Sequence, residues 1–491
     1  MTLSRTTLAA LSAALMLGAA TAATTAHLTP RPSATKAETT CAQISQYGVT
    51  FTLDRAYACG QFANGDYWVA PDSPSGTVTI TAITPKFTGT TNGWQVNPTD
   101  VTTQGFDGRT NLDLPGVHFD AKLVPKLPYV AHGGQSIVKA VSTTNSTRSP
   151  LQTAVVLTVL ASVPADNGAT VLRPPYFGLD KPLRSINDIH LEKLPQLAPP
   201  ADDVPTLTSL HARFQRVQLD TQTDWDGEDV HPIDNLPVYG AEVAIENTVA
   251  VLRLMLNDSA QEKLPLAIDL VEYGQDLSAA LRAGLNFEAL GGHRHGRKLV
   301  LALTAALLDD AGIASQIHDA PYNTFQEDGH VHESRVTKGL VLWGAPATSS
   351  AGCAEADYWY DQDTGSGSRD CADPYDYIDG GYTPGDDYQL CCEFMAFRAM
   401  GVALRLMPEL QQTWNNGNFL AYVDRMVNCG AHTLPDPYAP HGDGQPGNGR
   451  YPELNGSNKN GGAEAREWYD DPFADAMWAT YGVNPVPPIC P

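Results

Sequence analysis

The sequence predicts a multidomain chain of β and α parts, in which an N-terminal β-sandwich is followed by an α/α barrel or incomplete toroid. Three observations lead to this fold class. Short β-branched runs separated by Gly, Pro, Asn and Asp fill the first third of the chain. A proline-rich stretch follows them. Beyond it, apolar residues recur at the spacing of an amphipathic helix.

The first 26 residues have the pattern of a secretory signal peptide. Arg5 precedes an apolar stretch from Leu8 to Leu17, and small residues between Ala20 and Ala26 offer a cleavage site. This apolar stretch is too short to cross a bilayer, which takes about 20 apolar residues, and no later segment is long enough. We therefore expect a secreted protein, extracellular or periplasmic, with no membrane insertion.

The cysteines agree with export, because an oxidising compartment lets them pair. No C-x-x-C occurs, which argues against a zinc site. We expect two to four disulfides, and proximity in the chain predicts Cys41–Cys59 and Cys353–Cys371. The eight cysteines are Cys41, Cys59, Cys353, Cys371, Cys391, Cys392, Cys429 and Cys490.

The net charge of the chain is -24. Binding to nucleic acid or to an anionic membrane needs a basic face, so the charge argues against both partners. A polyanionic substrate would be repelled by this net negative charge, so its site would need local cations. The densest basic cluster after the signal is "GGHRHGRK", residues 291–298.

The domain boundaries follow the changes in composition. Residues 27–44 form a Thr/Pro/Ala-rich spacer, and residues 45–172 carry the strand-like runs, including "YGVTFTLDRAY" and "PLQTAVVLTVLASV". Residues 173–236 form a Pro-rich joint, where many positions cannot donate to a regular hydrogen-bond ladder. Residues 237–491 form the predicted catalytic α/α-toroid domain.

The helical part contains several long amphipathic runs, such as "YGAEVAIENTVAVLRLML" and "RKLVLALTAALLDDAGI". Gly284 and Gly312 are typical of helix C-termini. Some of these runs are apolar nearly all round and should lie inside stacked helical hairpins. The segment 315–386 between two of the helices is rich in Tyr, Trp, Asp and Gly, and loops of this length are usually functional.

The stretch 291–298 is the first candidate site. A phosphate loop would need Lys and then Ser or Thr where Arg297 and Lys298 stand, so nucleotide binding is excluded. An anion site is the more natural interpretation, because backbone N–H groups at a helix start and basic side chains converge there. Arg294 and Lys298 would bind substrate. A capping loop that is merely basic explains the pattern equally well.

A metal site is the weaker alternative. His293 and His295 could be joined by a second His-x-His pair, His330 and His332, since residues i and i+2 of an extended segment point the same way. No cofactor is required by the chemistry that we predict. These four histidines would bind a structural divalent metal ion.

The first hypothesis for the chemistry is β-elimination on a uronate-containing glycan. That reaction needs neutralisation of the sugar carboxylate and a base for the adjacent C–H. Arg297 would neutralise the carboxylate, and His293 and His295 are acid/base candidates. Among tyrosines we favour Tyr388, beside the loop "GGYTPGDDYQ", and place Tyr239 second.

Glycoside hydrolysis is the alternative, and it needs two carboxyl groups roughly 5 to 9.5 Å apart. Glu327 is the leading candidate. Interleaved aromatic and polar residues, among them Tyr382, Trp414 and Asn415, are typical of sugar-stacking subsites. The other carboxylate candidates are Asp328, Asp386, Asp387, Glu246 and Glu272.

The sequence resembles a group of secreted bacterial proteins at five stretches: "NGDYWV", "RPPYFGLDK", "YGQDL", "GGHRHGRK" and "WNNGNFLAYVDRM". In that group a β-sandwich precedes a helical region similar to the α/α toroids of heparinase-like polysaccharide lyases. The resemblance implies breakdown of an extracellular polysaccharide, first of all by a lyase. In heparinase-like lyases the toroid usually comes first. The order found here is more like that of some α/α-barrel glycoside hydrolases. A third hypothesis is a non-catalytic carbohydrate-binding protein.

Overall fold

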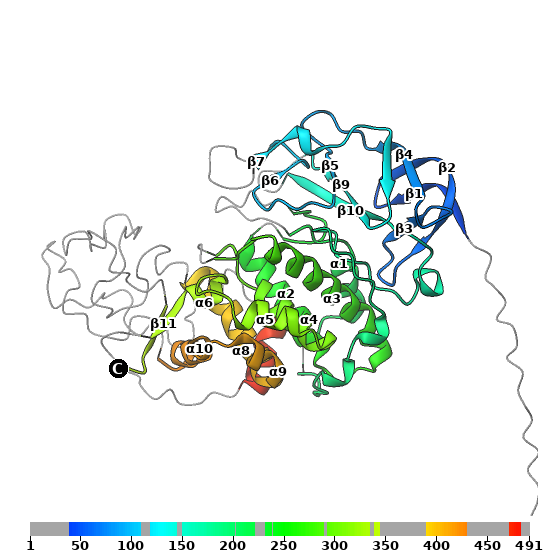
Figure 1. The fold of residues 1–491 in the computed structure, drawn as a ribbon. Coiled ribbons are helices and arrows are strands. Elements are labelled where there is room, and N and C mark those ends of the chain that lie inside the picture. Colours follow the sequence, from blue (N-terminus) through cyan, green and yellow to red (C-terminus); the bar gives the residue numbers. More distant parts are fainter. Residues whose placement is uncertain are drawn as a thin grey trace, which may run out of the picture. The chain divides into compact units, whose positions relative to one another are not determined.

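The computed structural model describes residues 39–109, 118–144, 150–201, 203–220, 231–237, 239–288, 292–333, 338–343, 389–429 and 471–482. Within these ranges strands come first and helices follow, so the predicted order of a β part before a helical part is confirmed (Figure 1). No helix in the described ranges is long and apolar enough to cross a membrane.

The β part is built on one curled sheet of eight strands. The strands run in the order β5-β9-β10-β3-β2-β4-β8, with β1 paired to β2. Neighbours are antiparallel except β10 and β3, which are parallel. The strands of this sheet are β1 (Thr40–Gln46), β2 (Val49–Gln61), β3 (Tyr67–Ala70), β4 (Thr77–Thr84), β5 (Trp94–Val96), β8 (Tyr129–His132), β9 (Gln135–Ser142) and β10 (Leu151–Val159).

The middle of this sheet is buried on both faces. Val155 of β10 belongs to a core that includes Phe51, whereas its neighbour Val156 belongs to a second core. The second core also contains Ala279 and Ala280 of helix α3. This explains the unbroken apolar run in β10, because a strand covered on both sides has no need of polar alternation.

Two short strand pairs lie outside the large sheet. One pair is parallel and the other antiparallel. They are β6 (Thr103–Gln104) with β7 (His118–Phe119), and β11 (Val331–Glu333) with β12 (Val341–Trp343).

The predicted disulfide between Cys41 and Cys59 is confirmed. It ties β1 to β2 across a Cα–Cα distance of 5.9 Å. Cys392 is also disulfide-bonded. The other predicted pair, Cys353 and Cys371, lies outside the described residues.

The helical part is organised around helix α4, every residue of which is buried. Helix α4 packs against α2, α3, α5 and α9. The helices are α1 (Leu207–Phe214), α2 (Gly240–Leu254), α3 (Ala260–Arg282), α4 (Arg297–Leu308), α5 (Ala311–His318), α6 (Gln326–Gly329), α8 (Phe394–Leu406), α9 (Pro408–Trp414), α10 (Gly417–Cys429) and α12 (Pro472–Tyr481).

Of the two predicted helix ends, one is right and one is wrong. Gly284 follows the end of α3 with a φ of +99°, the left-handed conformation that glycine allows. Gly312 instead lies in the first turn of α5. The chain breaks earlier, because Asp309 is left-handed and the Asp310 side chain accepts hydrogen bonds from the backbone of Gly312 and Ile313.

Candidate functional site

The basic stretch is buried at the start of helix α4. Arg297, Lys298 and His295 have no exposed surface, and His293 is 4% exposed. A helix does begin at Arg297, as the sequence predicts. Its first turn is packed against other parts of the chain and does not face outward.

The glycines of this stretch allow two helices to approach each other. A Cβ on Gly296 would lie 2.5 Å from the Cα of Ala244 in α2, and the φ of Gly296 is +89°. A Cβ on Gly240, the first residue of α2, would lie 1.9 Å from the carbonyl oxygen of His293. The pattern of glycines is therefore explained by packing of α2 against the start of α4.

The charge of Arg297 is neutralised inside the protein. Its Nε and Nη2 donate to the two carboxylate oxygens of Asp220 at 2.8 and 3.1 Å, and its Nη1 donates to the carbonyls of His293 and His295. Burial alone would raise the pKa of Asp220, but the Arg297 guanidinium holds it below its usual value. The group that we expected to neutralise a substrate carboxylate already neutralises one of the protein's own.

The predicted substrate-binding cations are also paired. Lys298 Nζ lies 2.5 Å from Asp328 Oδ1 and 4.4 Å from the ring centroid of Trp414, which is itself buried. Arg294 Nη1 lies 3.2 Å from Glu288 Oε1. Lys298 and Trp414 do lie together, as a sugar subsite would require, but inside the core.

Glu327 lies beside the same stretch. Its Oε1 accepts a 2.7 Å hydrogen bond from the backbone N–H of Gly296, and its Oε2 has no hydrogen-bond partner within the described part of the chain. Burial raises the pKa of Glu327 to about 7, although the nearby Lys298 lowers it. A protonated carboxyl group is therefore available here near neutral pH.

A chain of polar contacts continues from His295 to β12. Gln326 Nε2 lies 3.1 Å from His295 Nδ1 and donates to Glu393 at 2.7 Å. Glu393 also contacts His330 Nδ1 at 2.6 Å and accepts a hydrogen bond from Trp343 at 2.9 Å. Burial lowers the pKa of His295 well below its usual value, so its ring is neutral at pH 7. Such a network fixes the side chains of several elements in one arrangement.

The aromatic candidates divide into described and undescribed residues. Tyr239 packs edge-on against His293 with 4.9 Å between ring centroids. Asn415 ends α9 in the left-handed conformation, and its Nδ2 donates to the carbonyl of His318 at 2.9 Å. Four candidates lie outside the described residues: Tyr382, Asp386, Asp387 and Tyr388.

The metal alternative gains no support from the described residues. Among them, no group of three or more His, Cys, Asp or Glu side chains is arranged to hold a metal ion. His330 directs Nδ1 to Glu393, and His332 lies on the following strand, β11. In this part of the chain the two His-x-His pairs therefore do not form such a cluster.

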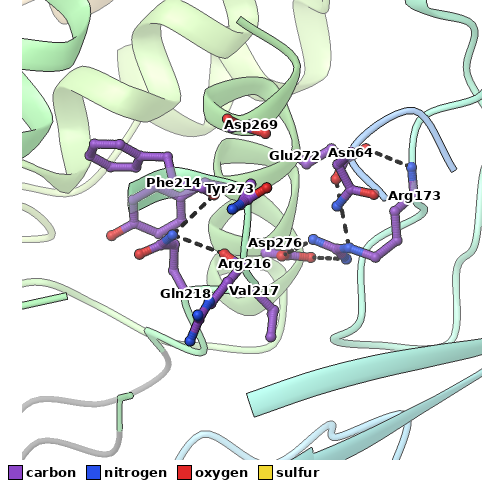
Figure 2. Close-up of a pocket in the computed structure, with 11 residues that line it drawn as sticks. Asn64, Arg173, Phe214, Arg216, Val217, Gln218, Asp269, Glu272, Tyr273 and Asp276 are labelled. Atoms are coloured by element: carbon purple, nitrogen blue, oxygen red, sulfur yellow. Dashed lines mark hydrogen bonds and ion pairs between the residues drawn. The ribbon is translucent and has the colours of Figure 1, made fainter. Parts of the chain in front are cut away.

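A pocket lies beside helix α3 (Figure 2). Its cavity is small, about 10 Å³, which is room for about one water molecule, and it opens to solvent. One wall is α3. Another is the segment 214–218 that ends and follows α1, and the last is formed by Asn64 and Arg173.

Three carboxylates of α3 line this pocket. Asp269, Glu272 and Asp276 are spaced by three and four residues, so they share one side of the helix, and all three are buried. Tyr273 lines the pocket as well, and its hydroxyl donates to Asp220 at 2.5 Å. Helix α3 therefore connects the pocket to the Arg297 network.

Arg173 is the centre of the charge cluster at the pocket wall. It donates to both oxygens of Asp276, at 3.1 and 2.6 Å, and its Nε lies 2.9 Å from Asp66 Oδ2. Its backbone N–H donates to Glu272 Oε1 at 2.8 Å, while its Nε lies 3.7 Å from Glu272 Oε2. One buried guanidinium thus faces three carboxyl groups, so carboxyl groups outnumber cations here.

Two carboxyl oxygens at the pocket have no hydrogen-bond partner within the described part of the chain. They are Asp269 Oδ1 and Glu272 Oε2. The other oxygen of Asp269 lies 2.7 Å from Nδ1 of His211, which is one-third exposed. Burial raises the pKa of Asp269 to about 7 against the opposing bond to His211, and it raises the pKa of Glu272 well above its usual value. Buried carboxyl groups with raised pKa values that line a pocket are candidates for an acid–base site.

Sequence reasoning missed most of this site. It named Glu272 as one of several carboxylates and quoted "YGQDL" without assigning it chemistry. The available signal was "DLVEYGQD", residues 269–276, in which the spacing places three acidic residues on one face of the helix. Arg173 and Asp66 carried no local signal, because they come from distant parts of the chain.

The chain matches no family model, and neither a curated protein nor a solved structure is significantly similar to it.

Proposed function

We propose that the protein is a secreted glycoside hydrolase that uses Glu272 and Asp269 of helix α3 as its acid and base. One observation carries the proposal. Two buried carboxyl groups line one pocket, and each has an oxygen without a hydrogen-bond partner in the described part of the chain. Glycoside hydrolysis needs such a pair, with one member protonated and the other ionised.

The environments of the two groups suggest their roles. Burial raises the pKa of Glu272 well above its usual value, so a protonated Glu272 can donate a proton to the leaving oxygen through Oε2. Asp269 ionises near neutral pH. His211 holds one of its oxygens, which leaves Oδ1 to take a proton from water. His211 reaches solvent, so it can pass that proton on.

The size of the pocket limits the substrate. Its cavity of about 10 Å³ has room for about one water molecule, far less than the roughly 300 to 1,000 Å³ of sites for drug-sized ligands. Only a small group of the substrate, and not a whole sugar ring, therefore fits inside it. The α/α-barrel architecture and secretion belong to the same proposal, and they are supported by the helical repeats, the signal pattern and the Cys41–Cys59 disulfide.

β-Elimination is the second candidate function. It is favoured by the contact between Tyr239 and His293 beside the protonated Glu327. It ranks below hydrolysis because Arg297, the expected carboxylate neutraliser, is held by Asp220.

A glycan panel tests the class of reaction. The purified protein is incubated with neutral, amino-bearing and uronate-containing glycans, while reducing ends and the ultraviolet absorbance of unsaturated uronates are followed together. We expect new reducing ends without absorbance. Absorbance that rises with the reducing ends would establish the lyase instead, and activity on no glycan would contradict both enzyme proposals.

A further inference from the structure

The pocket at α3 presents a third acceptor beside the two carboxyl oxygens. Gln218 lines the pocket and is 2% exposed. Its Nε2 donates to the carbonyls of Phe214 and Arg216, at 3.2 and 2.9 Å. Both amide hydrogens are thereby used, so the orientation of the amide is fixed and Oε1 is left with no partner in the described chain.

The cations of the pocket wall are occupied. Arg173 is paired with Asp276 and Asp66, and Arg216 Nη1 lies 2.8 Å from Asp234 Oδ2. No guanidinium of the described lining is therefore left to meet a substrate carboxylate. A uronate here would place another carboxylate beside buried carboxyl groups and without a free cation in the described lining to neutralise it.

The partner-free acceptors point to a ligand that donates. A buried acceptor without a partner costs about 1 to 3 kcal/mol, and a ligand that supplies donors removes this cost. A hydroxyl group supplies one hydrogen and no charge. A protonated amino group supplies three hydrogens and a positive charge, which also offsets the excess of carboxylates around Arg173.

We propose that this pocket binds a protonated amino group through Gln218 Oε1 and the acidic face of α3. The inference also names a substrate, a glycan with free amino sugars, in place of the uronate glycan that the sequence predicts. This part of the inference rests on the proposed function. Gln218 is then a specificity-determining residue, which holds the amino group beside Glu272 and Asp269.

Binding of monosaccharides tests the inference without any turnover. Calorimetry or ligand-observed NMR at pH 6, where a primary amine is protonated, compares D-glucosamine with D-glucose, N-acetylglucosamine and D-glucuronate. We expect glucosamine to bind about tenfold or more tightly than glucose or N-acetylglucosamine, and glucuronate to bind most weakly. The inference would be overturned if glucosamine and glucose bind equally well or if neither binds. A preference for glucuronate would overturn it too.

Variants locate the effect in the pocket. Gln218→Leu should weaken glucosamine binding about tenfold and leave glucose binding unchanged, whereas Gln411→Leu on the exposed surface of α9 should change neither. Glu272→Gln, which keeps the shape of the side chain, provides a second variant and should also weaken glucosamine binding. If both pocket variants bind glucosamine like the wild type, the site lies elsewhere.

The two proposals fail in different ways. Glucosamine binding without hydrolysis of any glycan would contradict the proposed function and leave the amino-group site in place. Hydrolysis of neutral glycans with no preference for amino sugars would leave the function and overturn the site.

Discussion

The molecule contains two groups of buried charges, and they are built differently. At the start of α4, Arg297 is paired with Asp220, and Lys298 with Asp328. At the pocket beside α3, carboxyl groups outnumber the cations. The first group is close to electrically balanced, as a core requires, whereas the second is unbalanced beside an open space.

This difference shows which buried charges are candidates for function. A buried ion pair is costly to form, and breaking one leaves an uncompensated charge, so balanced pairs are explained by the fold. An excess of one sign next to a pocket has no such explanation and suggests that a ligand completes the site. The basic stretch is easier to notice in the sequence than the acidic face of α3. The acidic face nevertheless has the geometry that a ligand site requires, because it lines a pocket.

The largest stability effect should come from the balanced group. Arg297→Met leaves Asp220 buried without its partner, so we expect a loss of about 3 to 5 kcal/mol in the free energy of unfolding, measured with denaturant. Arg55→Met, which breaks the exposed pair with Asp72, is the control and should cost less than about 1 kcal/mol. Equal losses for the two variants would remove the contrast between buried and exposed pairs.

Gly296→Ala should have the next largest effect. The new methyl group would lie 2.5 Å from Ala244 Cα, in a backbone conformation with φ of +89°, so strain and overpacking together should cost roughly 2 to 4 kcal/mol. Gly417→Ala is the control, since a Cβ there meets nothing within 4 Å. If Gly296→Ala is as stable as the control, the glycine serves ligand approach and not helix packing.

Asp269→Asn should stabilise the protein, but only near neutral pH. Because folding raises the pKa of Asp269 from 3.8 to about 7, the folded state binds more protons in this interval and the wild type loses stability as pH rises from about 4 to 7. Asparagine does not titrate. We expect a gain of roughly 1 to 3 kcal/mol at pH 7 and almost none at pH 4.

Thermal unfolding at the two pH values measures this difference. A gain that is the same at both would assign the effect to something other than titration of Asp269. A loss at pH 7 would show that the ionised carboxylate stabilises the fold, contrary to the excess of negative charge that we describe.

The smallest effect concerns the pH dependence of turnover. Burial, and to a smaller extent Asp66, keeps the ionised form of Asp269 unfavourable, while the bond from His211 lowers the pKa of Asp269. With Asp269 as the base, activity should rise as pH passes about 7. In His211→Ala this rise should move to higher pH by about one unit. A pH profile of kcat/KM that keeps its rise at the same pH would exclude His211 from any role in positioning the base.

Much of the fold could be predicted from local patterns. β-Branched runs, helical periodicity and the nearest cysteine pair gave the order of the two parts and the Cys41–Cys59 bond. The break at Asp309 was missed, because one left-handed residue interrupts an otherwise continuous apolar pattern. Burial of "GGHRHGRK" was missed too, since Asp220, which makes that burial tolerable, is far away in the sequence.

The candidate site could be predicted only in fragments. Spacing along α3 places Asp269, Glu272 and Asp276 on one face, and that much is local. Which of these carboxyls is neutralised depends on Arg173 and His211, and which oxygen stays partner-free depends on tertiary contacts. Neither follows from one-dimensional spacing.

The sharpest test of the acidic site compares two buried glutamates with raised pKa values, Glu272 at the pocket and Glu327 beside the basic stretch. Each is changed to glutamine, and kcat/KM is measured on the best glycan, with folding verified by thermal unfolding. We predict that Glu272→Gln loses about 10²- to 10⁴-fold and that Glu327→Gln stays within a few-fold of the wild type. A large loss in Glu327→Gln with Glu272→Gln unimpaired would contradict the assignment and return the active site to "GGHRHGRK".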